Sequence, residues 1–309
     1  MQLQRVLIVH KKSLYQLYVR EHRDPAVRQA LRRGDAAAER LRRSDRAHRA
    51  ATAEVQRTLR RLGVASELRW RGQLRAVRDV DLVVAVGGDG TVLDAARFLD
   101  ARVPLLGINS DPEASVGHLC AGPAAALGEL LAGLRSGALR PRPRVRLCLR
   151  VDGRVVLGPC LNDALLAHES PAELSRFELA PLPAAALGDD GRLVNPASVA
   201  WRASRSSGLW VCTATGSTGA VRSAGGRAMG AGSRRLQYLV REPFHPPRAA
   251  REAAWQGYVG PAALLAAVSR MRRARLWADG PHRSVALRYG QTVVFDESAP
   301  PLLLVPPLS

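Results

Sequence analysis

A glycine-rich turn between an apolar strand and a helix limits what this chain can fold into. The turn is Gly87-Gly88-Asp89-Gly90-Thr91. Residues 81–86 before it are valine-rich and almost continuously apolar, which is typical of a buried parallel strand. Residues 91–99 after it have the amphipathic spacing of a helix, and Thr91, followed three residues later by Asp94, has the pattern of a helix N-cap. The sequence therefore predicts a strand–turn–helix unit of an α/β sheet.

Two interpretations of this turn are open from its residues alone. Glycine permits positive φ and lets a ligand approach the main chain, and a helix N-terminus presents free N–H groups to a phosphate. Asp89 then stands at the carboxyl end of a strand, where open α/β sheets bind their ligands. A tight turn with a solvated aspartate has the same five residues, so the rest of the chain has to decide.

Length, cysteine content and hydropathy exclude several broad classes. A chain of 309 residues suits one large domain or two ordinary ones. Its four cysteines are widely spaced without a C-x-x-C pair, which indicates reduced thiols and neither a disulfide framework nor a zinc site. No apolar run reaches the roughly 18 residues of a membrane span, so we expect no membrane partner. The chain opens directly into an apolar strand, and its excess of Arg, Ala and Pro is typical of a GC-rich genome, so we expect a bacterial cytoplasmic protein.

The formal charge of +19 comes almost entirely from arginine. Lysine occurs only at positions 11 and 12, so 44 of the 46 basic residues are arginine. A basic surface suits nucleic acid, but only five Tyr and four Phe accompany it and no nucleic-acid motif occurs. We therefore expect no nucleic-acid partner, and an electropositive surface that attracts anionic nucleotides.

The first part of the chain alternates strands and helices. A long helical stretch covers residues 25–62, with apolar residues at helical spacing, and residues 123–136 form a second candidate helix. Strands are expected at residues 5–9, 65–70, 81–86 and 104–108. This alternation predicts a parallel, doubly wound sheet.

Beyond Pro141-Arg142-Pro143 the pattern changes to short alternating segments separated by turn signals. A surface loop is expected at residues 181–191. The expected strands are residues 144–151, 154–157, 161–167, 176–180, 198–201, 209–213, 284–287 and 291–296. We therefore expect a second domain that is rich in antiparallel sheet.

Two polar motifs follow expected strands in this second part. Asn162-Asp163 combines an amide that can bond a base edge with a carboxylate that can accept both hydroxyls of a ribose diol, although a polar turn has the same composition. The segment Thr213–Gly219, followed by Ser223-Ala224-Gly225-Gly226, offers small hydroxyls and main-chain groups to a base or a phosphate, with a flexible linker as the alternative.

Other common sites have no support in the sequence. No lysine follows a glycine-rich loop as in a Walker A motif, and no G-x-G-x-x-G follows the first strand. His118, His168 and His245 are isolated, so we expect no metal-ligating residues.

Taken together, the glycine-rich turn, the Asn-Asp pair and the Thr-x-Thr-Gly-Ser-Thr segment leading to Ser-Ala-Gly-Gly resemble the signature of the NAD kinase family, in the family's order. Finer features resemble the branch typified by the animal mitochondrial enzyme. They are residues 107–112 (Gly-Ile-Asn-Ser-Asp-Pro), residues 117–120 (Gly-His-Leu-Cys) and residues 206–209 (Ser-Ser-Gly-Leu). The resemblance covers nearly the whole chain.

The resemblance implies α/β plus β architecture: a Rossmann-like domain over residues 1–138, a β-sandwich-like NAD-binding domain over residues 139–291, and a segment from about residue 292 to 309 that returns to the first. It also implies transfer of the ATP γ-phosphoryl to the 2′-hydroxyl of the adenosine ribose of NAD, giving NADP. Magnesium or another divalent cation would come with ATP, and the protein would be a homodimer or homotetramer.

Site residues are carried over position by position. Asp89 would be the general base, or the group that orients the acceptor hydroxyl, while Asn162 would face the adenine and Asp163 its ribose. The remaining nucleotide-binding positions would be Gly87, Gly88, Gly90, Thr91, Thr215, Ser217, Thr218, Gly219 and Ser223.

Three positions depart from the family's usual pattern. Gly219 and Ala220 stand where an alanine and an aromatic residue are common, so one aromatic wall of the adenine pocket is missing. Ser207 replaces a common aspartate, and Asp163 replaces the more usual glutamate. Two other functions stay open: a lipid or diacylglycerol-type kinase, because it shares the glycine-rich turn, and a non-catalytic NAD-binding sensor that has lost turnover through the altered adenine pocket.

Overall fold

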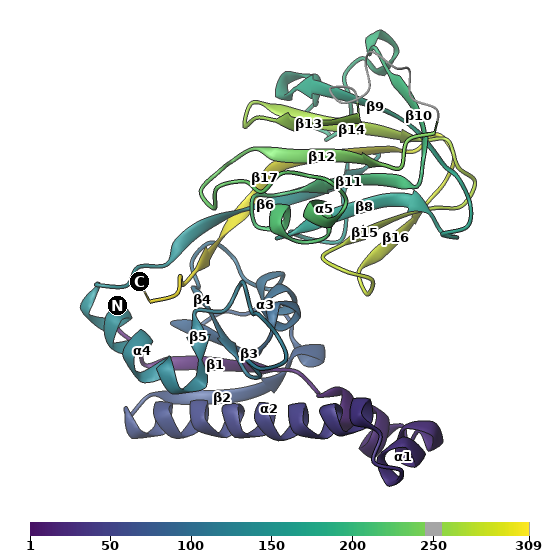
Figure 1. The fold of residues 1–309 in the computed structure, drawn as a ribbon. Helices are drawn as coiled ribbons and strands as arrows, with labels where there is room; N and C mark the ends of the chain where they lie inside the picture. The colour runs from purple at the N-terminus through teal and green to yellow at the C-terminus, as the bar shows by residue number, and fades with distance from the viewer. Residues whose placement is uncertain (245–254, 309) are drawn as a thin grey trace. The chain divides into compact units, whose positions relative to one another are not determined.

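The computed structural model describes residues 1–244 and 255–308, and His245 lies outside them. The chain divides into two compact units, each described by itself (Figure 1). Unit 1 consists of Met1–Pro143 with Leu302–Ser309, and unit 2 of Arg144–Pro301. Within the described residues, no helix combines the length and apolarity needed to cross a membrane.

Unit 1 is built on a parallel sheet with the strand order β4-β3-β1-β2. Strand β1 is Arg5–His10, β2 is Ala65–Trp70, β3 is Leu82–Gly87 and β4 is Leu105–Asn109. The register pairs His10 with Val86 and Gly87 with Asn109, so the carboxyl ends of these strands share one edge. The short strand β5 (Gly122–Pro123) lies beside β4, as does the last residue of β17, Leu304.

The expected helix over residues 25–62 is two helices, α1 (Pro25–Arg32) and α2 (Ala36–Arg61). The break has a local cause. Gly34 has a φ of 71°, and the Asp35 side chain caps α2 by accepting from the N–H groups of Ala37 and Ala38, both at 2.9 Å. The capping signal of an aspartate inside an Ala- and Arg-rich stretch was missed from sequence.

Helices cover the sheet of unit 1. Helix α2 runs along β1 and β2, as Figure 1 shows, and shares one core cluster with α4 (Leu127–Ser136), which follows a 3-10 turn at Ala124–Ala126. The residues of that cluster alternate along the strands, as in Val6 and Ile8, and the residues between them are buried as well. The valine-rich strands are therefore covered on both faces, as expected for a doubly wound sheet.

Unit 2 is a sandwich of two antiparallel sheets. One has the order β10-β9-β14-β17, with β6 beside β17 and β7 beside β6, and the other has the order β13-β12-β11-β8-β15-β16. The bounds are β6 Arg142–Val151, β7 Arg154–Val155, β8 Asp163–His168, β9 Ser175–Pro183, β10 Arg202–Ser206, β11 Gly208–Cys212, β12 Leu236–Arg241, β13 Gln256–Val259, β14 Ala263–Ser269, β15 Ala274–Ala278, β16 Ser284–Leu287 and β17 Thr292–Leu304.

The core of unit 2 lies between the two sheets. Both sheets contribute apolar side chains that are at most 1% exposed, including Leu147, Phe177, Phe295, Leu166, Val211 and Leu276. Each such side chain contributes about 1.5–3 kcal/mol through burial. The predicted fold class, a Rossmann-like α/β domain with a β-sandwich-like domain, is confirmed.

Two local expectations for unit 2 were wrong, and four strands were missed. Residues 198–201 are not a strand. Ser198 belongs to a 3-10 turn at Pro196–Ser198, the Trp201 indole donates to the Pro196 carbonyl at 3.0 Å, and β10 begins only at Arg202. The expected loop at residues 181–191 begins as the end of β9 and contains a 3-10 turn at Ala184–Ala186. Strands β12 to β15 were not identified.

The Pro-rich end of the chain is also regular, since β17 continues through Pro300 and Pro301. The carbonyl groups of these prolines accept from the buried Arg146 guanidinium, from Nε at 2.6 Å and from Nη2 at 3.5 Å. Prolines lack an N–H but keep a carbonyl acceptor, and that acceptor is used here.

Candidate functional site

The glycine-rich turn joins β3 to α3 (Asp89–Ala96), and Gly88 is the N-cap in extended backbone. Thr91 is therefore not the N-cap that the sequence predicts. Its side chain lies inside the first turn, 1% exposed, and Oγ1 has no hydrogen-bond partner among the described residues. Asp94 closes no capping box either, because its carboxylate pairs with the Arg71 guanidinium at 2.9 Å.

Close packing, and not left-handed backbone, explains the first glycine of the turn. None of Gly87, Gly88 and Gly90 has a positive φ, so that part of the expectation was wrong. A Cβ on Gly87 would lie 2.1 Å from Thr91 Oγ1, whereas a Cβ on Gly90 would meet nothing nearer than Arg71 Nη1 at 3.9 Å. The turn therefore folds back on its own helix at Gly87 and stays open at Gly90.

The half-buried Asp89 carboxylate is held by main-chain donors from the loop after β4. Oδ1 accepts from the Leu119 N–H at 2.8 Å, and Oδ2 accepts from the His118 N–H at 3.1 Å. A carboxylate has about four acceptor positions, so each oxygen keeps capacity for a further donor. The arrangement orients Asp89 and leaves it able to accept a hydroxyl proton.

Asn109, at the end of β4, shapes that loop. Its Nδ2 donates to the Ser115 carbonyl at 2.8 Å, and its Oδ1 accepts from the Asp111 N–H at 3.1 Å. Gly117 has a φ of 66°, and a Cβ there would lie 2.6 Å from Asn109 Nδ2. The two short segments singled out from sequence, residues 107–112 and 117–120, therefore act as one support for Asp89.

In unit 2, Asn162 and Asp163 stand at the start of β8, and sequence reasoning missed the residues that hold them. Asp279 Oδ1 accepts from the Asn162 N–H at 2.7 Å, and Oδ2 accepts from the Leu161 N–H at 2.9 Å. Arg283 Nη1 donates to the same Oδ2 at 2.9 Å, in an ion pair whose side chains are 3% and 6% exposed. The available signal was an Asp-Gly turn followed by an arginine four residues after the aspartate.

Both side chains of the Asn-Asp pair are poised for a ligand. Asn162 Oδ1 is buried without a hydrogen-bond partner among the described residues, a state that costs free energy unless a donor arrives. Asp163 is 9% exposed, and burial, together with the nearby charge of Asp279, raises the pKa of its carboxyl to about 7.

The segment from Thr213 to Gly219 lies against this pair. The Thr213 N–H donates to the Asn162 carbonyl at 2.9 Å, and its hydroxyl donates to the Leu161 carbonyl at 2.5 Å. A Cβ on Gly216 would lie 2.1 Å from the Asn162 carbonyl oxygen. The structure thus brings together two motifs that are about 50 residues apart in the sequence.

The other predicted positions of this segment differ in exposure. Ser217 is fully buried, and its hydroxyl donates to the Ala214 carbonyl at 2.7 Å and accepts from the Met229 N–H at 2.8 Å, so it holds the turn. Thr215 is half-buried. Thr218, Gly219 and Ser223 are exposed. Within the described residues, no three His, Cys, Asp or Glu side chains are gathered to hold a metal ion.

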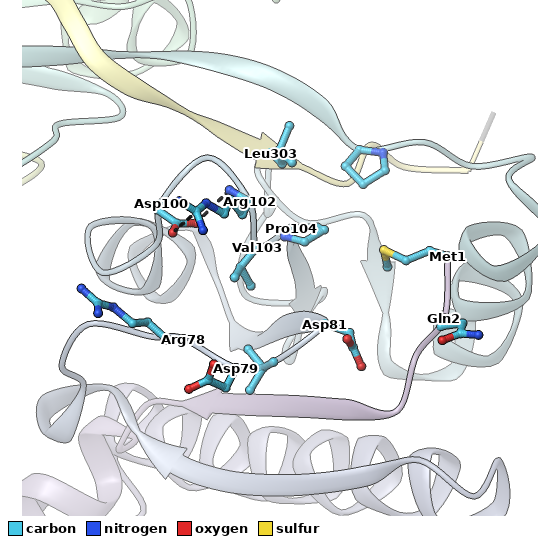
Figure 2. Close-up of a pocket in the computed structure, with 12 residues that line it drawn as sticks. Met1, Gln2, Arg78, Asp79, Asp81, Asp100, Arg102, Val103, Pro104 and Leu303 are labelled. Carbon is cyan, nitrogen blue, oxygen red and sulfur yellow. Dashed lines mark hydrogen bonds and ion pairs between the residues drawn. The ribbon is translucent and has the colours of Figure 1, made fainter.

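A cavity of about 810 Å³ lies at the opposite edge of the unit 1 sheet, beside the residues that precede β1, β3 and β4 (Figure 2). Asp81 borders it, but its carboxylate already accepts from the Gln4 and Arg5 N–H groups at 2.7 and 2.8 Å. Asp100 and Arg102, which also border the cavity, form an ion pair with 4.0 Å between Asp100 Oδ2 and Arg102 Nε. Since open α/β sheets bind ligands at their carboxyl ends, we place the candidate site at Asp89 and not here.

Residues 5–138 match the family model described as the ATP-NAD kinase N-terminal domain. The chain is 35% identical over 246 residues to a probable NADH kinase of Oryza sativa subsp. japonica, an alignment that spans 75% of this chain and 72% of the rice protein. It is also 35% identical over 171 residues to human mitochondrial NAD kinase 2. That alignment spans 46% of this chain and 38% of the human protein.

The fold also matches a solved structure, that of an NAD kinase from Archaeoglobus fulgidus in complex with ATP. The TM-score is 0.64 at 20% sequence identity, over 97% of this chain and 92% of the archaeal chain. At this identity the match concerns the fold, and it supports the two-unit architecture described above.

The contact beneath Gly87 generates a stability prediction. Gly87→Ala will lower the free energy of unfolding by about 1–3 kcal/mol, because its Cβ overlaps Thr91. Gly90→Ala is the matched control in the same turn and will change stability by less than about 1 kcal/mol. Urea unfolding of both variants measures the difference, and equal losses would contradict the packing described.

Asp163 generates a pH prediction. In the unfolded chain its pKa is about 3.9, whereas in the folded chain it is about 7. The folded state therefore retains the proton between these values, and the contribution of Asp163 to stability falls as pH rises from about 4 to 7. Asp163→Asn removes this penalty and will be more stable than wild type at pH 8 by roughly 2–4 kcal/mol, with the gain shrinking towards pH 4.

Thermal unfolding from pH 4 to 8 tests this, with the exposed Asp190→Asn as the control that should show no such trend. A pH-independent difference between Asp163→Asn and wild type would refute the raised pKa.

Proposed function

The chain belongs to the NAD kinase family and is a phosphotransferase of that family, and on this premise we propose that it transfers the γ-phosphoryl group of ATP to the 2′-hydroxyl of the adenosine ribose of NAD, giving NADP. The observation that carries the proposal is the Asp89 carboxylate, held by two main-chain N–H groups at the carboxyl edge of β3 with acceptor capacity to spare.

In the proposed reaction, Asp89 accepts the proton of the 2′-hydroxyl as the ribose oxygen attacks the γ-phosphorus. The bond from that phosphorus to the β,γ-bridging oxygen breaks, and ADP leaves. Phosphoryl transfer needs mainly positioning and charge stabilisation. A positioned base supplies roughly 10²–10⁴ in rate, and the fixed direction of the Asp89 carboxylate supports this role.

The nucleoside contacts are proposed for unit 2. The unpartnered Asn162 Oδ1 suits a donor such as the adenine amino group, and the Asp163 carboxylate suits the ribose hydroxyls. Thr215 and the exposed Thr218, Gly219 and Ser223 would border the adenine. Ser217 would contribute indirectly, through the turn that its hydroxyl holds.

The donor side of the site is proposed for the glycine-rich turn, with Gly87, Gly88, Gly90 and Thr91 bordering the phosphates of ATP. We propose that magnesium enters as part of the ATP complex, since magnesium is commonly held largely by water and substrate phosphates.

NADH is a second candidate acceptor. The relative that aligns over 72% of its own length is named a probable NADH kinase. The 2′-hydroxyl is the same in NAD and NADH, so the chemistry at Asp89 would not change. An assay of NADP and NADPH formation from ATP or polyphosphate, with NAD, NADH and diacylglycerol as competing acceptors, tests the proposed function.

Phosphorylation of diacylglycerol alone would favour a lipid kinase, and tight NAD binding without turnover would favour a sensor. We further propose a homodimer or homotetramer and a bacterial cytoplasmic setting. Both follow from the resemblance and composition discussed above, and sedimentation measures the first.

The role of Asp89 predicts the effect of removing its charge. Asp89→Asn will lower kcat at least about tenfold with little change in the Kd for NAD, because the base is lost while the nucleoside contacts stay. Asp100→Asn, a charge removed from the opposite edge of unit 1, is the control and should keep full activity. A wild-type kcat in Asp89→Asn would contradict the role of Asp89 as the base.

A separate prediction concerns adenine recognition. Asn162→Ala will raise the KM for NAD roughly three- to tenfold with kcat largely kept, because it removes a contact made equally in ground and transition states. Its N–H still donates to Asp279, so the turn should persist. Asn195→Ala, at an exposed position of the same unit, is the control. An unchanged KM would remove Asn162 from the adenine site.

A further inference from the structure

Lys11 is a half-buried cation at the edge of the sheet where Asp89 stands. It directly follows β1, and because His10 pairs with Val86, Lys11 is level with Gly87 on the neighbouring strand. No hydrogen bond or ion pair of its ammonium occurs with any residue in the described part of the chain. Lys12, by contrast, pairs with Glu21 at 2.8 Å and lies 4.3 Å over the Trp70 ring.

The main chain at Lys11 is fixed to the same strand ends as the turn. His48 Nε2 donates to the Lys11 carbonyl at 2.9 Å, and its Nδ1 accepts from the Ser110 hydroxyl at 3.0 Å. The Ser110 N–H in turn donates to the Gly87 carbonyl at 3.0 Å. Burial lowers the pKa of His48 to about 4, so this link is neutral at pH 7. Three neighbouring strand ends are thus tied together beneath the glycine-rich turn.

A second cation, Arg71, lies near the Lys11 ammonium. Burial, and then the Arg71 guanidinium, lower its pKa, and Arg71 also lies at the open face of Gly90. Burial raises the pKa of the Cys120 thiol, the nearby charge of Asp89 raises it further, and the charge of Lys11 lowers it. Arg71 already pairs with Asp94 at 2.9 Å, so of these two cations it is Lys11 whose ammonium has no ion-pair partner within the described residues.

We propose that the Lys11 ammonium binds the β- and γ-phosphate oxygens of the phosphoryl donor, an inference that rests on the function proposed above. The transferred phosphoryl must lie next to the hydroxyl that Asp89 activates, and Lys11 stands at the neighbouring strand end. The lysine ammonium is a compact, strongly hydrated point charge with three donors, which suits phosphate oxygens. In a chain where 44 of 46 basic residues are arginine, the position of the lysines is itself informative.

A purely structural role for Lys11 would be to neutralise Asp111. Asp111 Oδ2 is buried without a hydrogen-bond partner among the described residues, yet the two groups form no ion pair within 4.0 Å. If Lys11 served only Asp111, then removing either charge would have the same effect. If Lys11 serves the donor phosphates, then Asp111→Asn will leave nucleotide affinity unchanged or raise it.

The test compares Lys11→Met and Lys11→Gln with Lys12→Met, the matched control one residue away. Titration with a non-hydrolysable ATP analogue and magnesium gives Kd without turnover, steady-state assays give the KM for ATP and for NAD, and melting temperatures report folding. We expect both Lys11 variants to raise Kd and the KM for ATP at least about tenfold, the loss of one charge-assisted bond. The KM for NAD, and all values for Lys12→Met, should change less than about twofold.

Several results would overturn the assignment. They are a wild-type Kd in both Lys11 variants, a larger effect on NAD than on the ATP analogue, or an equal loss in Asp111→Asn. Lys11→Arg keeps the charge and should recover part of the affinity, which a simple unfolding defect would not allow. If the wild-type chain forms neither NADP nor NADPH, the proposed function fails, while the Kd comparison still decides whether Lys11 binds phosphate.

Discussion

The candidate functional residues of each unit depend on a carboxylate that receives two consecutive main-chain N–H groups. Asp89 receives those of His118 and Leu119, and Asp279 receives those of Leu161 and Asn162. Such charge-assisted bonds are roughly twice as strong as neutral ones. Each carboxylate therefore fixes a turn that is far from it in sequence. It does so through main-chain N–H groups, so the side chains on that turn keep their own hydrogen-bonding groups for other contacts.

The two units differ in the groups that surround this carboxylate. In unit 2 the carboxylate is buried and needs the Arg283 guanidinium to offset its desolvation. In unit 1 Asp89 is only half-buried, and no arginine of the described residues pairs with it. The neutral His48 and Ser110 connect the strand ends next to it. A structural carboxylate can be neutralised, whereas one proposed to accept a proton must keep its own charge available.

Sequence reasoning placed most of the first unit because its signals are local. The strands β1 to β4 were predicted within one or two residues, β1 and β3 from valine-rich runs, and the glycine-rich turn was identified directly from its sequence. The helix break at Gly34 and Asp35, the N-cap at Gly88 and the strands β12 to β15 were not predicted. An apolar run such as β14 has the same pattern as a buried helix. The supports at Asp279, His48 and Lys11 depend on contacts over long sequence separations, which no local pattern shows.

Strand β17 carries a consequence for how the chain is made. Residues 292–295 pair with β14 in unit 2, while Leu304 and Val305 bond the Leu105 main chain and Val305 belongs to the core of unit 1. During synthesis from the N-terminus, the ribosome therefore releases some 140 residues of unit 1 long before the segment that completes its core. Until residue 305 has left the ribosome, the core of unit 1 lacks the Val305 side chain and the β17 side of β4 is unpaired at Leu105. Its final form is reached only after all of unit 2 has been translated.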